Sequence, residues 1–481
     1  MHGTYISHDH VTKSRQYRTP HKRGKGSDAY TQRQAKKETP YTIHISKIEP
    51  ISSFEENSQT TSDNMSPMKV LELYYTFICR GTYVIPKSKF EYFVMTTLSQ
   101  PRSHDELTVE EQCLFVLYLA IRSLAEQLCE QVENADKTAR MAELELAKMS
   151  VEFHTNFYYC CACMYVSLFH HAMGNTEKSN YYSYQAKYYW SLGKPNLDQY
   201  ELQLKKIELF WKNLYGSTML DFRAFVFSMP AIYEVAVDNT LEDHLPEGVW
   251  DYVKIAQITM SNYKIYMDIM QTVSISIQQY RTQTIAKMVD CNSDTFFQHE
   301  QLQATLVYEG VKFNFLNKLS DVAFVPILEE MAHDICLMTE HPLFPFCAPV
   351  VFIAILRISE HHLKCCQLVE TGLKPRIFTI TSSKTQQPLT IDYLEDLRRD
   401  HRALQLLSKR YRFISLQHGD LLMNVELFLS RYQQHQHQDV VGSNQTTVQQ
   451  SVVNTEVMQN DEILMALLKY VQAVSKNMPL Q

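Results

Sequence analysis

The chain has little glycine for its length. Its 481 residues include 12 Gly and 16 Pro, against 29 Tyr and 23 Phe. Glycine and proline supply most tight turns, so their scarcity argues against a sheet of many short strands. Few turn residues and many large packing side chains are typical of helices joined by short loops. We therefore expect an all-α fold, and a hydrophobic share of 45% is enough for a core.

Cysteine is missing from the first part of the chain. None occurs before Cys79, and the eleven cysteines are scattered or adjacent, with no secretory signal ahead of them. Neighbours such as Cys160 and Cys161 cannot easily bridge each other in an apolar helix. This usage favours a reducing intracellular compartment.

Long apolar runs are also missing. The longest, residues 344–356, is interrupted by Pro345 and Pro349 and is followed by Arg357. Such a run is too short to span a bilayer, so we expect no membrane partner.

The motifs of common catalytic sites are absent. The sequence has no Gly-x-Ser-x-Gly elbow, no phosphate-binding Gly-x-x-x-x-Gly-Lys loop, no Gly-x-Gly-x-x-Gly, no His-Glu-x-x-His and no Asp-Asp-x-x-Asp run. The last absence weakens the alternative of a helical enzyme or a terpenoid-binding pocket. The acidic pair Glu329-Glu330 stands in helical sequence and is expected to face solvent. We predict that the chain is not an enzyme.

Histidine and cysteine gather in two places without completing a metal site. Consecutive residues on a helix point about 100° apart, and the first group has no Cys-x-x-Cys spacing. In the second group His361 and Cys365 are four residues apart, as are His362 and Cys366, and either pair could share a metal. Two ligands do not make a site, so no metal and no cofactor are predicted in the chain as given. The first group comprises His154, Cys160, Cys161, Cys163, His170 and His171.

Apolar residues recur every three or four positions through most of residues 67–432, which predicts a body of helices. The capping box Thr108-x-x-Glu111 should open one helix, and Gly174-Asn175 should end another. Helices are expected on both sides of Gly81 and over residues 107–128, 137–153, 157–173, 177–192, 248–289, 294–319, 323–340, 350–370, 394–411 and 416–432.

The segment 205–246 has the most particular residue order in the chain. Its apolar residues predict a buried helical stripe, and Pro230 predicts the end of a helix. Asp221 and Arg223 are too close in sequence to share a helical face, so each should find its partner elsewhere. The stripe consists of Ile207, Phe210, Trp211, Leu214 and Tyr215.

This order resembles the regulatory middle-homology domain of fungal zinc-cluster transcription factors. The matching features are the Phe210-Trp211 pair, the Asp221-x-Arg223 pair, a small-residue turn at Pro230 and an acidic segment closed by Leu245-Pro246. Residues 341–349, which lead into an apolar helix, are similar to a late segment of that domain. The resemblance implies control of RNA polymerase II transcription in the nucleus, with a helical body that gates activity, holds partners or senses a metabolite.

The family's binuclear zinc cluster needs six cysteines in a short basic stretch, and it is not found here. Residues 20–27 (PHKRGKGS) still resemble the linker that follows such a cluster. Two explanations stay open: the cysteine-bearing part was lost, or the likeness is accidental. Zinc would be a cofactor only if a cluster lay upstream, and DNA specificity would otherwise come from a partner.

The first 66 residues are polar, without helical period, and are predicted to be a disordered basic arm. Residues 1–40 carry nine Lys and Arg against three Asp and Glu, which is a formal charge of +6; with −7 for the whole chain, the remainder carries −13. Clustered cations could bind phosphates directly but weakly, or serve as an import signal. The residues concerned are Lys22, Arg23, Lys25, Lys36 and Lys37.

After the body, residues 433–459 are predicted to be a Gln-, Ser- and Thr-rich linker, and residues 460–481 an amphipathic C-terminal helix. That helix could bind the transcription machinery or fold back on the body, and a homo- or heterodimer is a further expected arrangement. The alternative function is a helical-repeat scaffold of the tetratricopeptide kind, suggested by residues 174–193. It predicts units about 34 residues long, and the sequence does not repeat them.

Overall fold

The computed structural model describes residues 65–79, 83–98, 106–149, 151–193, 197–205, 259–271, 274–275, 294–319 and 321–443. All of them belong to the unit that spans residues 60–481. The segment 206–258 lies outside the described residues, as do residues 1–64 of the basic arm and the predicted C-terminal helix.

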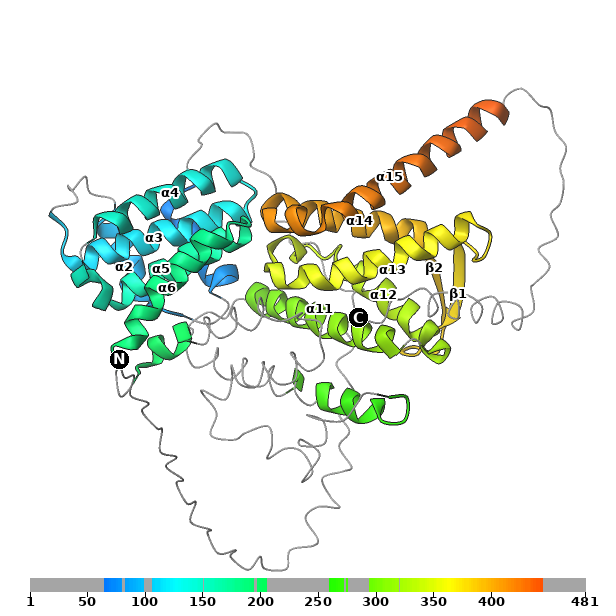
Figure 1. Cartoon of the computed structure of the whole chain (residues 1–481), viewed down its shortest axis with the longest axis horizontal. Helices are drawn as coiled ribbons and strands as arrows, with labels where there is room; N and C mark the ends of the chain where they lie inside the picture. The colour runs from blue at the N-terminus through cyan, green and yellow to red at the C-terminus, as the bar shows by residue number, and fades with distance from the viewer. Residues whose placement is uncertain are drawn as a thin grey trace, which may run out of the picture. The chain divides into compact units, whose positions relative to one another are not determined.

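The N-terminal helices pack as consecutive hairpins (Figure 1). Short connections join α3 to α4 and α5 to α6, and α3 also packs along α5. The elements are α1 (Pro67–Leu73), η3 (Tyr74–Ile78), α2 (Lys87–Thr96), α3 (Val109–Leu128), α4 (Val132–Lys148), η5 (Val151–Thr155), α5 (Phe157–Ala172) and α6 (Thr176–Ser191).

The predicted capping box sets the start of α3. Thr108 Oγ1 accepts a hydrogen bond from Glu111 N at 3.3 Å, and Glu111 Oε2 accepts one from Thr108 N at 2.9 Å. These two bonds satisfy backbone groups that a helix end otherwise leaves unpaired.

The turn between α5 and α6 requires glycine. Gly174 has a φ of +77°, and a Cβ there would lie 2.6 Å from Leu416 Cδ1. A side chain at this position would therefore be strained by its backbone and would also collide with Leu416 of the last helix, α15 (Arg412–Ser443). Asn175 then caps α6 by accepting from Lys178 N.

The C-terminal elements combine helices with one hairpin (Figure 1). Strands β1 and β2 pair antiparallel, with Ile377 opposite Asp392 and Thr381 opposite Pro388. The elements are α11 (Asp294–Leu319), η7 (Val322–Phe324), α12 (Val325–Met338), η8 (Phe344–Phe346), η9 (Pro349–Val351), α13 (Phe352–Glu370), β1 (Ile377–Thr381), β2 (Pro388–Asp392), α14 (Tyr393–Arg410) and α15 (Arg412–Ser443).

One large apolar core joins the two groups of helices, and a smaller one lies between the hairpin, α13, α14 and α15. Phe77 of η3 stacks on Phe346 with ring centroids 4.4 Å apart. Arg410 Nη2 lies 3.0 Å from Glu130 Oε1. None of the helices in the described part of the chain has the length and apolar character needed to cross a bilayer.

The all-α prediction is confirmed, and α11 has the predicted bounds 294–319. Three local differences stand out. The helix expected over 137–153 begins and ends earlier, as α4. The last helix begins at Arg412, has non-helical backbone at His418 and continues to Ser443, so the prediction of a linker without helix is wrong for residues 433–443. The hairpin β1–β2 was not expected. Among the described residues it is the one sheet, and it does not change the fold class.

Candidate functional site

The residues predicted to carry function lie outside the described residues. They are the basic set Lys22, Arg23, Lys25, Lys36 and Lys37 and the motif residues Phe210, Trp211, Asp221, Arg223 and Pro230. These predictions therefore stay predictions. The described residues bring a different set of chemically reactive side chains together, between α12 and α13.

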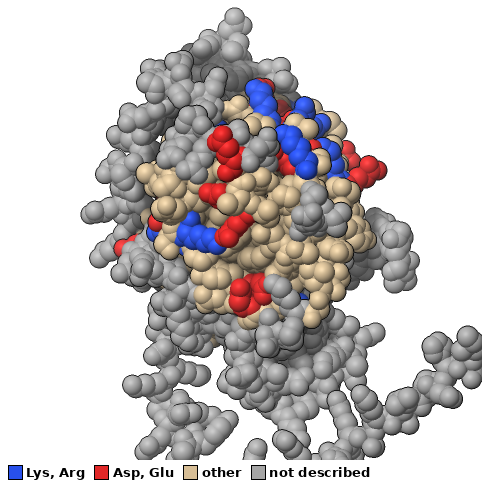
Figure 2. All heavy atoms as spheres, turned by 90° about the vertical axis from the view of Figure 1, so that its left-hand side faces the viewer, with Lys and Arg blue, Asp and Glu red and all other residues tan. Residues whose placement is uncertain are grey.

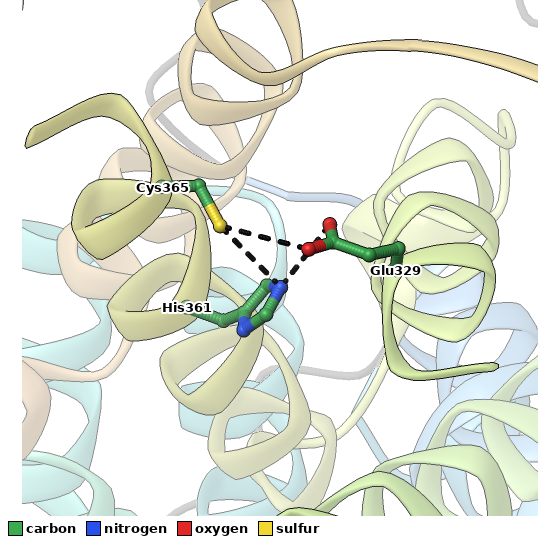
Figure 3. Close-up of side chains that lie close together, drawn as sticks. All are labelled: Glu329, His361 and Cys365. Carbon is green, nitrogen blue, oxygen red and sulfur yellow. Dashed lines mark hydrogen bonds and ion pairs between the residues drawn. The ribbon is translucent and has the colours of Figure 1, made fainter. Parts of the chain in front are cut away.

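Glu329 of α12 lies against His361 and Cys365 of α13 (Figure 3). The four-residue spacing puts His361 Nε2 and Cys365 Sγ on one face of α13, 3.6 Å apart. Glu329 Oε2 lies 3.3 Å from His361 Nε2. Cys365 is buried, Glu329 is 1% exposed and Glu330 is 3% exposed, so the prediction that Glu329 and Glu330 face solvent is wrong.

Lys374 completes the set, from the segment between α13 and β1. Its Nζ donates to Glu329 Oε1 and lies 3.2 Å from Cys365 Sγ. The same ammonium lies 4.1 Å from the centre of the Tyr393 ring, a cation–π contact. We call Glu329, His361, Cys365 and Lys374 the α12–α13 cluster.

Glu329, His361 and Lys374 of the cluster have shifted pKa values. Burial alone would lower the pKa of His361, but Cys365 and Glu329 beside it outweigh burial and raise it to about 10. Burial would raise the pKa of Glu329, yet His361 and Lys374 hold it well below its usual range. Burial also opposes the charge of Lys374, and Cys365 and Glu329 raise its pKa in spite of it. The buried charges are therefore stabilised by one another.

Glu330, the neighbour of Glu329, anchors the hairpin. Its carboxylate accepts hydrogen bonds from Ser382 Oγ at 2.6 Å and from the backbone N of Ser383 at 2.8 Å. Burial raises the pKa of Glu330, but the two serines outweigh it and lower the pKa overall. This carboxylate is buried because the turn after β1 supplies its donors.

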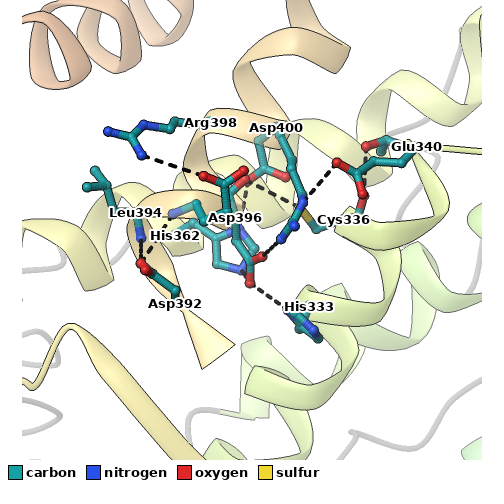
Figure 4. Close-up of polar contacts among 12 residues, drawn as sticks. His333, Cys336, Glu340, His362, Asp392, Leu394, Asp396, Arg398 and Asp400 are labelled. Carbon is teal, nitrogen blue, oxygen red and sulfur yellow. Dashed lines mark hydrogen bonds and ion pairs between the residues drawn. The ribbon is translucent and has the colours of Figure 1, made fainter. Parts of the chain in front are cut away.

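A second polar network lies beside the cluster, across α12, α13 and α14 (Figure 4). Asp396 accepts from His333 Nδ1 at 2.7 Å and from Arg399 Nη1 at 2.9 Å. His362 Nδ1 lies 2.7 Å from Asp400 Oδ2. Burial raises the pKa of Asp400, and the neighbouring His362 opposes that shift only in part. We call these residues the Asp396 network.

The six residues of the first histidine and cysteine group do not form a ligand set in the structure. Cys160, Cys161 and Cys163 are buried in α5, and Cys160 Sγ donates to Ala186 O. His170 pairs with Glu143 of α4. Within the described residues, three ligand-type side chains come together only in Glu329, His361 and Cys365.

One signal in the sequence pointed to these residues. Polar residues stand four apart inside apolar helices at Glu329 and His333, at His361 and Cys365, and at Asp396 and Asp400. A polar stripe of this kind must find partners if its helix is buried. The partners come from other segments, so spacing alone could not name them.

No family model matches the chain, and no curated protein or solved structure is detectably similar to it.

Proposed function

We propose that the chain regulates RNA polymerase II transcription in the nucleus, not as an enzyme but by binding other macromolecules through its helical body. Two features of the sequence support the proposal: the residue order of 205–246 and a +6 arm attached to a −13 remainder. In the described structure, the supporting observation is an exposed row of aromatic side chains on α6.

Three tyrosines form this row. Tyr181, Tyr184 and Tyr188 stand three and four residues apart, so they share one face of α6. Their exposed fractions are 56%, 69% and 44%. Large exposed aromatic residues are enriched at protein interfaces, where a rigid ring buries much area at little entropic cost.

The N-terminal helices also expose aliphatic side chains. Met141 and Leu144 of α4 are both more than half exposed. Figure 2 shows a face on this side of the molecule where most Lys and Arg lie near the top, Asp and Glu are scattered, and much of the remaining described surface is uncharged. A surface of this composition suits a protein partner better than nucleic acid.

The buried state of Cys365 and Glu329 supports a role without catalysis. A nucleophile or a general base must reach a substrate atom, and these side chains are almost fully covered. DNA contact is assigned to the arm or to a partner that carries a zinc cluster. The body would then repress, dimerise with or titrate such a partner, or recruit the transcription machinery.

A reporter experiment tests the proposal. The full chain is fused to a heterologous DNA-binding domain and tethered upstream of a reporter gene. We expect transcription to change by several-fold, and the change to be lost when Tyr181, Tyr184 and Tyr188 are replaced by serine. The matched control replaces Tyr92 of α2, which is 70% exposed, by serine. Unchanged transcription with the tethered chain would reject the regulatory role.

Direct DNA contact by the arm is measured separately. Replacing Lys22, Arg23, Lys25, Lys36 and Lys37 by alanine should weaken binding of the full chain to duplex DNA of any sequence. The slope of log affinity against log salt should fall by about one for each phosphate that the arm no longer neutralises. An unchanged slope would assign all DNA contact to a partner.

The second candidate is a helical scaffold without a role in transcription. It is favoured by the two successive hairpins α3–α4 and α5–α6. The spacing of these hairpins does not fit a tetratricopeptide unit, however. The starts of α3 and α5, at Val109 and Phe157, are further apart than the about 34 residues of such a unit. A chain that stays silent at the reporter and outside the nucleus would favour this candidate.

A further inference from the structure

The carboxylate of Glu329, the imidazole of His361 and the sulfur of Cys365 lie close together, and each is a common metal ligand (Figure 3). The three ligand atoms lie within 4.8 Å of one another. Cys365 Sγ is 3.6 Å from His361 Nε2 and 3.9 Å from Glu329 Oε1, and His361 Nε2 is 3.3 Å from Glu329 Oε2.

Two of these separations, sulfur to nitrogen and nitrogen to oxygen, have the length of an edge of a tetrahedral zinc site. Bonds of about 2.3 Å to sulfur, about 2.0–2.1 Å to nitrogen and about 2.0–2.2 Å to oxygen place neighbouring tetrahedral ligands about 3.3–3.7 Å apart. Only the sulfur–oxygen separation is longer, and it involves a carboxylate whose other oxygen faces the imidazole. The two oxygens of Glu329 thus face one other ligand each, and a rotation of the carboxylate would bring one of them into a shell with the imidazole nitrogen and the sulfur, which now lie within 4.8 Å of it.

The carboxylate supplies an independent observation. Glu329 Oε2 is buried and, among the described residues, accepts no hydrogen bond, although His361 Nε2 is only 3.3 Å away. A buried carboxylate oxygen without a hydrogen bond is costly. The imidazole of His361 is paired with this oxygen by charge but does not donate a hydrogen bond to it, and a cation between the two would bind both.

We propose that the α12–α13 cluster binds Zn²⁺ through Glu329, His361 and Cys365, and that Lys374 competes with the metal for this site. Nitrogen, sulfur and oxygen ligands on two packed helices are the donor set that zinc accepts. Zinc binds a neutral imidazole and a thiolate, so the proton that His361 carries beside Glu329 is released to the solvent as the metal binds. Three protein ligands leave a fourth position for water. The proposal does not depend on the proposed function.

Lys374 holds the cation position in this structure. Its ammonium contacts Glu329 Oε1 and Cys365 Sγ, two of the atoms that would bind zinc. The Tyr393 ring is a second favourable environment for the same charge. Lys374 lies two residues before Arg376, which pairs with Asp392 of the hairpin. Replacement of the Lys374 ammonium by zinc would therefore move the segment that leads into β1.

The neighbouring pair His362 and Cys366 provides a matched control. Its spacing is identical, but His362 pairs with Asp400 and Cys366 packs in the smaller core. The test titrates the purified, metal-free full chain with Co²⁺ and then displaces it with Zn²⁺. Cobalt bound to a thiolate has a sulfur-to-metal charge-transfer absorption, which reports Cys365 directly.

We expect one equivalent of Co²⁺ to bind with this absorption, and Zn²⁺ to remove it. Cys365→Ser should abolish the absorption and weaken Zn²⁺ binding by more than about 100-fold, because changes even outside the ligand shell typically cost about 10- to 100-fold. Cys366→Ser should leave both unchanged. Glu329→Gln should weaken binding while the absorption remains at saturating metal.

The variant Lys374→Met separates zinc binding from folding. Without its competitor, zinc should bind at least about tenfold more tightly, because the buried Glu329 charge then has no lysine partner. Zinc should also raise the melting temperature of this variant more than that of the natural chain. Absence of saturable cobalt binding by both chains, or an absorption that persists in Cys365→Ser, would overturn the proposal.

Discussion

The two groups of helices bury different kinds of side chain. Helices α3 and α5 bury mainly uncharged residues, such as Leu117 and Phe169. Helices α12, α13 and α14 bury carboxylates and histidines that contact one another, in the α12–α13 cluster and in the Asp396 network. Charge also occurs in the first group, but in fewer contacts: Glu126 of α3 pairs with Arg122 of the same helix and accepts from Thr138 of α4, and Glu143 of α4 pairs with His170 of α5.

This difference changes what each region is sensitive to. A buried apolar side chain contributes in proportion to the area it removes from water, and its loss leaves a cavity. A buried ion pair contributes little beyond its own desolvation cost, but the loss of one member leaves an unpaired charge. In the N-terminal helices the stability lost on substitution should therefore depend on how much side-chain volume is removed. In α12–α14 it should depend on which polar group is removed.

The largest predicted effect is that of Asp396→Ala. This change leaves His333 without its carboxylate and Arg399 with Glu340 as its remaining carboxylate, and it should lower the free energy of unfolding by about 3–5 kcal/mol. Leu117→Ala in α3 should cost about 2–5 kcal/mol through a cavity. Urea unfolding of the full chain measures both.

A double-mutant cycle tells the two mechanisms apart. With Asp396 already replaced, His333→Ala should cost much less than it does alone, because its partner is gone. Additive effects of the two changes would contradict the comparison. Arg402→Ala is the surface control; this side chain is 58% exposed and contacts Glu340, so its loss should cost less than about 1 kcal/mol.

The same contrast explains which features could be predicted from the sequence. Helices depend on spacing and caps within one segment, so α3 with its capping box and α11 with its bounds were predictable. The hairpin was missed, although Ile377 to Thr381 has the β-branched alternation of a strand. Its polar turn, residues 382–387, resembles a loop in a helical protein.

The cluster could be predicted only in part. His361 and Cys365 were recognisable as a pair from their spacing, whereas Glu329 was assigned to solvent. The burial of Glu329 depends on Lys374, which is 45 residues away in the sequence. No local pattern reports such a partner, because burial of a charge is decided by the segment that packs over it.

The dependence of stability on pH tests the comparison at a histidine of the N-terminal helices. Burial lowers the pKa of His171, at the end of α5, to about 4, below the usual value near 6.5. The folded state therefore binds fewer protons than the unfolded state between these values. The contribution of the neutral His171 side chain to the stability of the folded state is therefore complete above about pH 6.5. It is lost as the pH falls toward about 4.

The loss attributable to His171 should amount to at most about 3 kcal/mol, since one pKa unit corresponds to about 1.4 kcal/mol. Urea unfolding at a series of pH values measures it. His171→Gln should remove this part of the pH dependence while leaving stability at pH 7 within about 1 kcal/mol. A full acid loss retained in His171→Gln would assign the effect to other groups.

The smallest predicted effect concerns the end of a helix. Thr108→Ala removes the side-chain acceptor of the capping box, and α3 should lose about 1 kcal/mol, because the backbone N–H of Glu111 then has only water as a partner. Thr305→Ala within α11 is the control: its hydroxyl bonds to Gln301 O in its own helix, so alanine there should cost less than about 0.5 kcal/mol. Equal losses in the two variants would mean that α3 is held by its packing on α4 and α5 alone. In that case the stability of the first turn of α3 would also depend on buried apolar area, as in the rest of the N-terminal helices. The capping box that the sequence predicts there would then add nothing measurable.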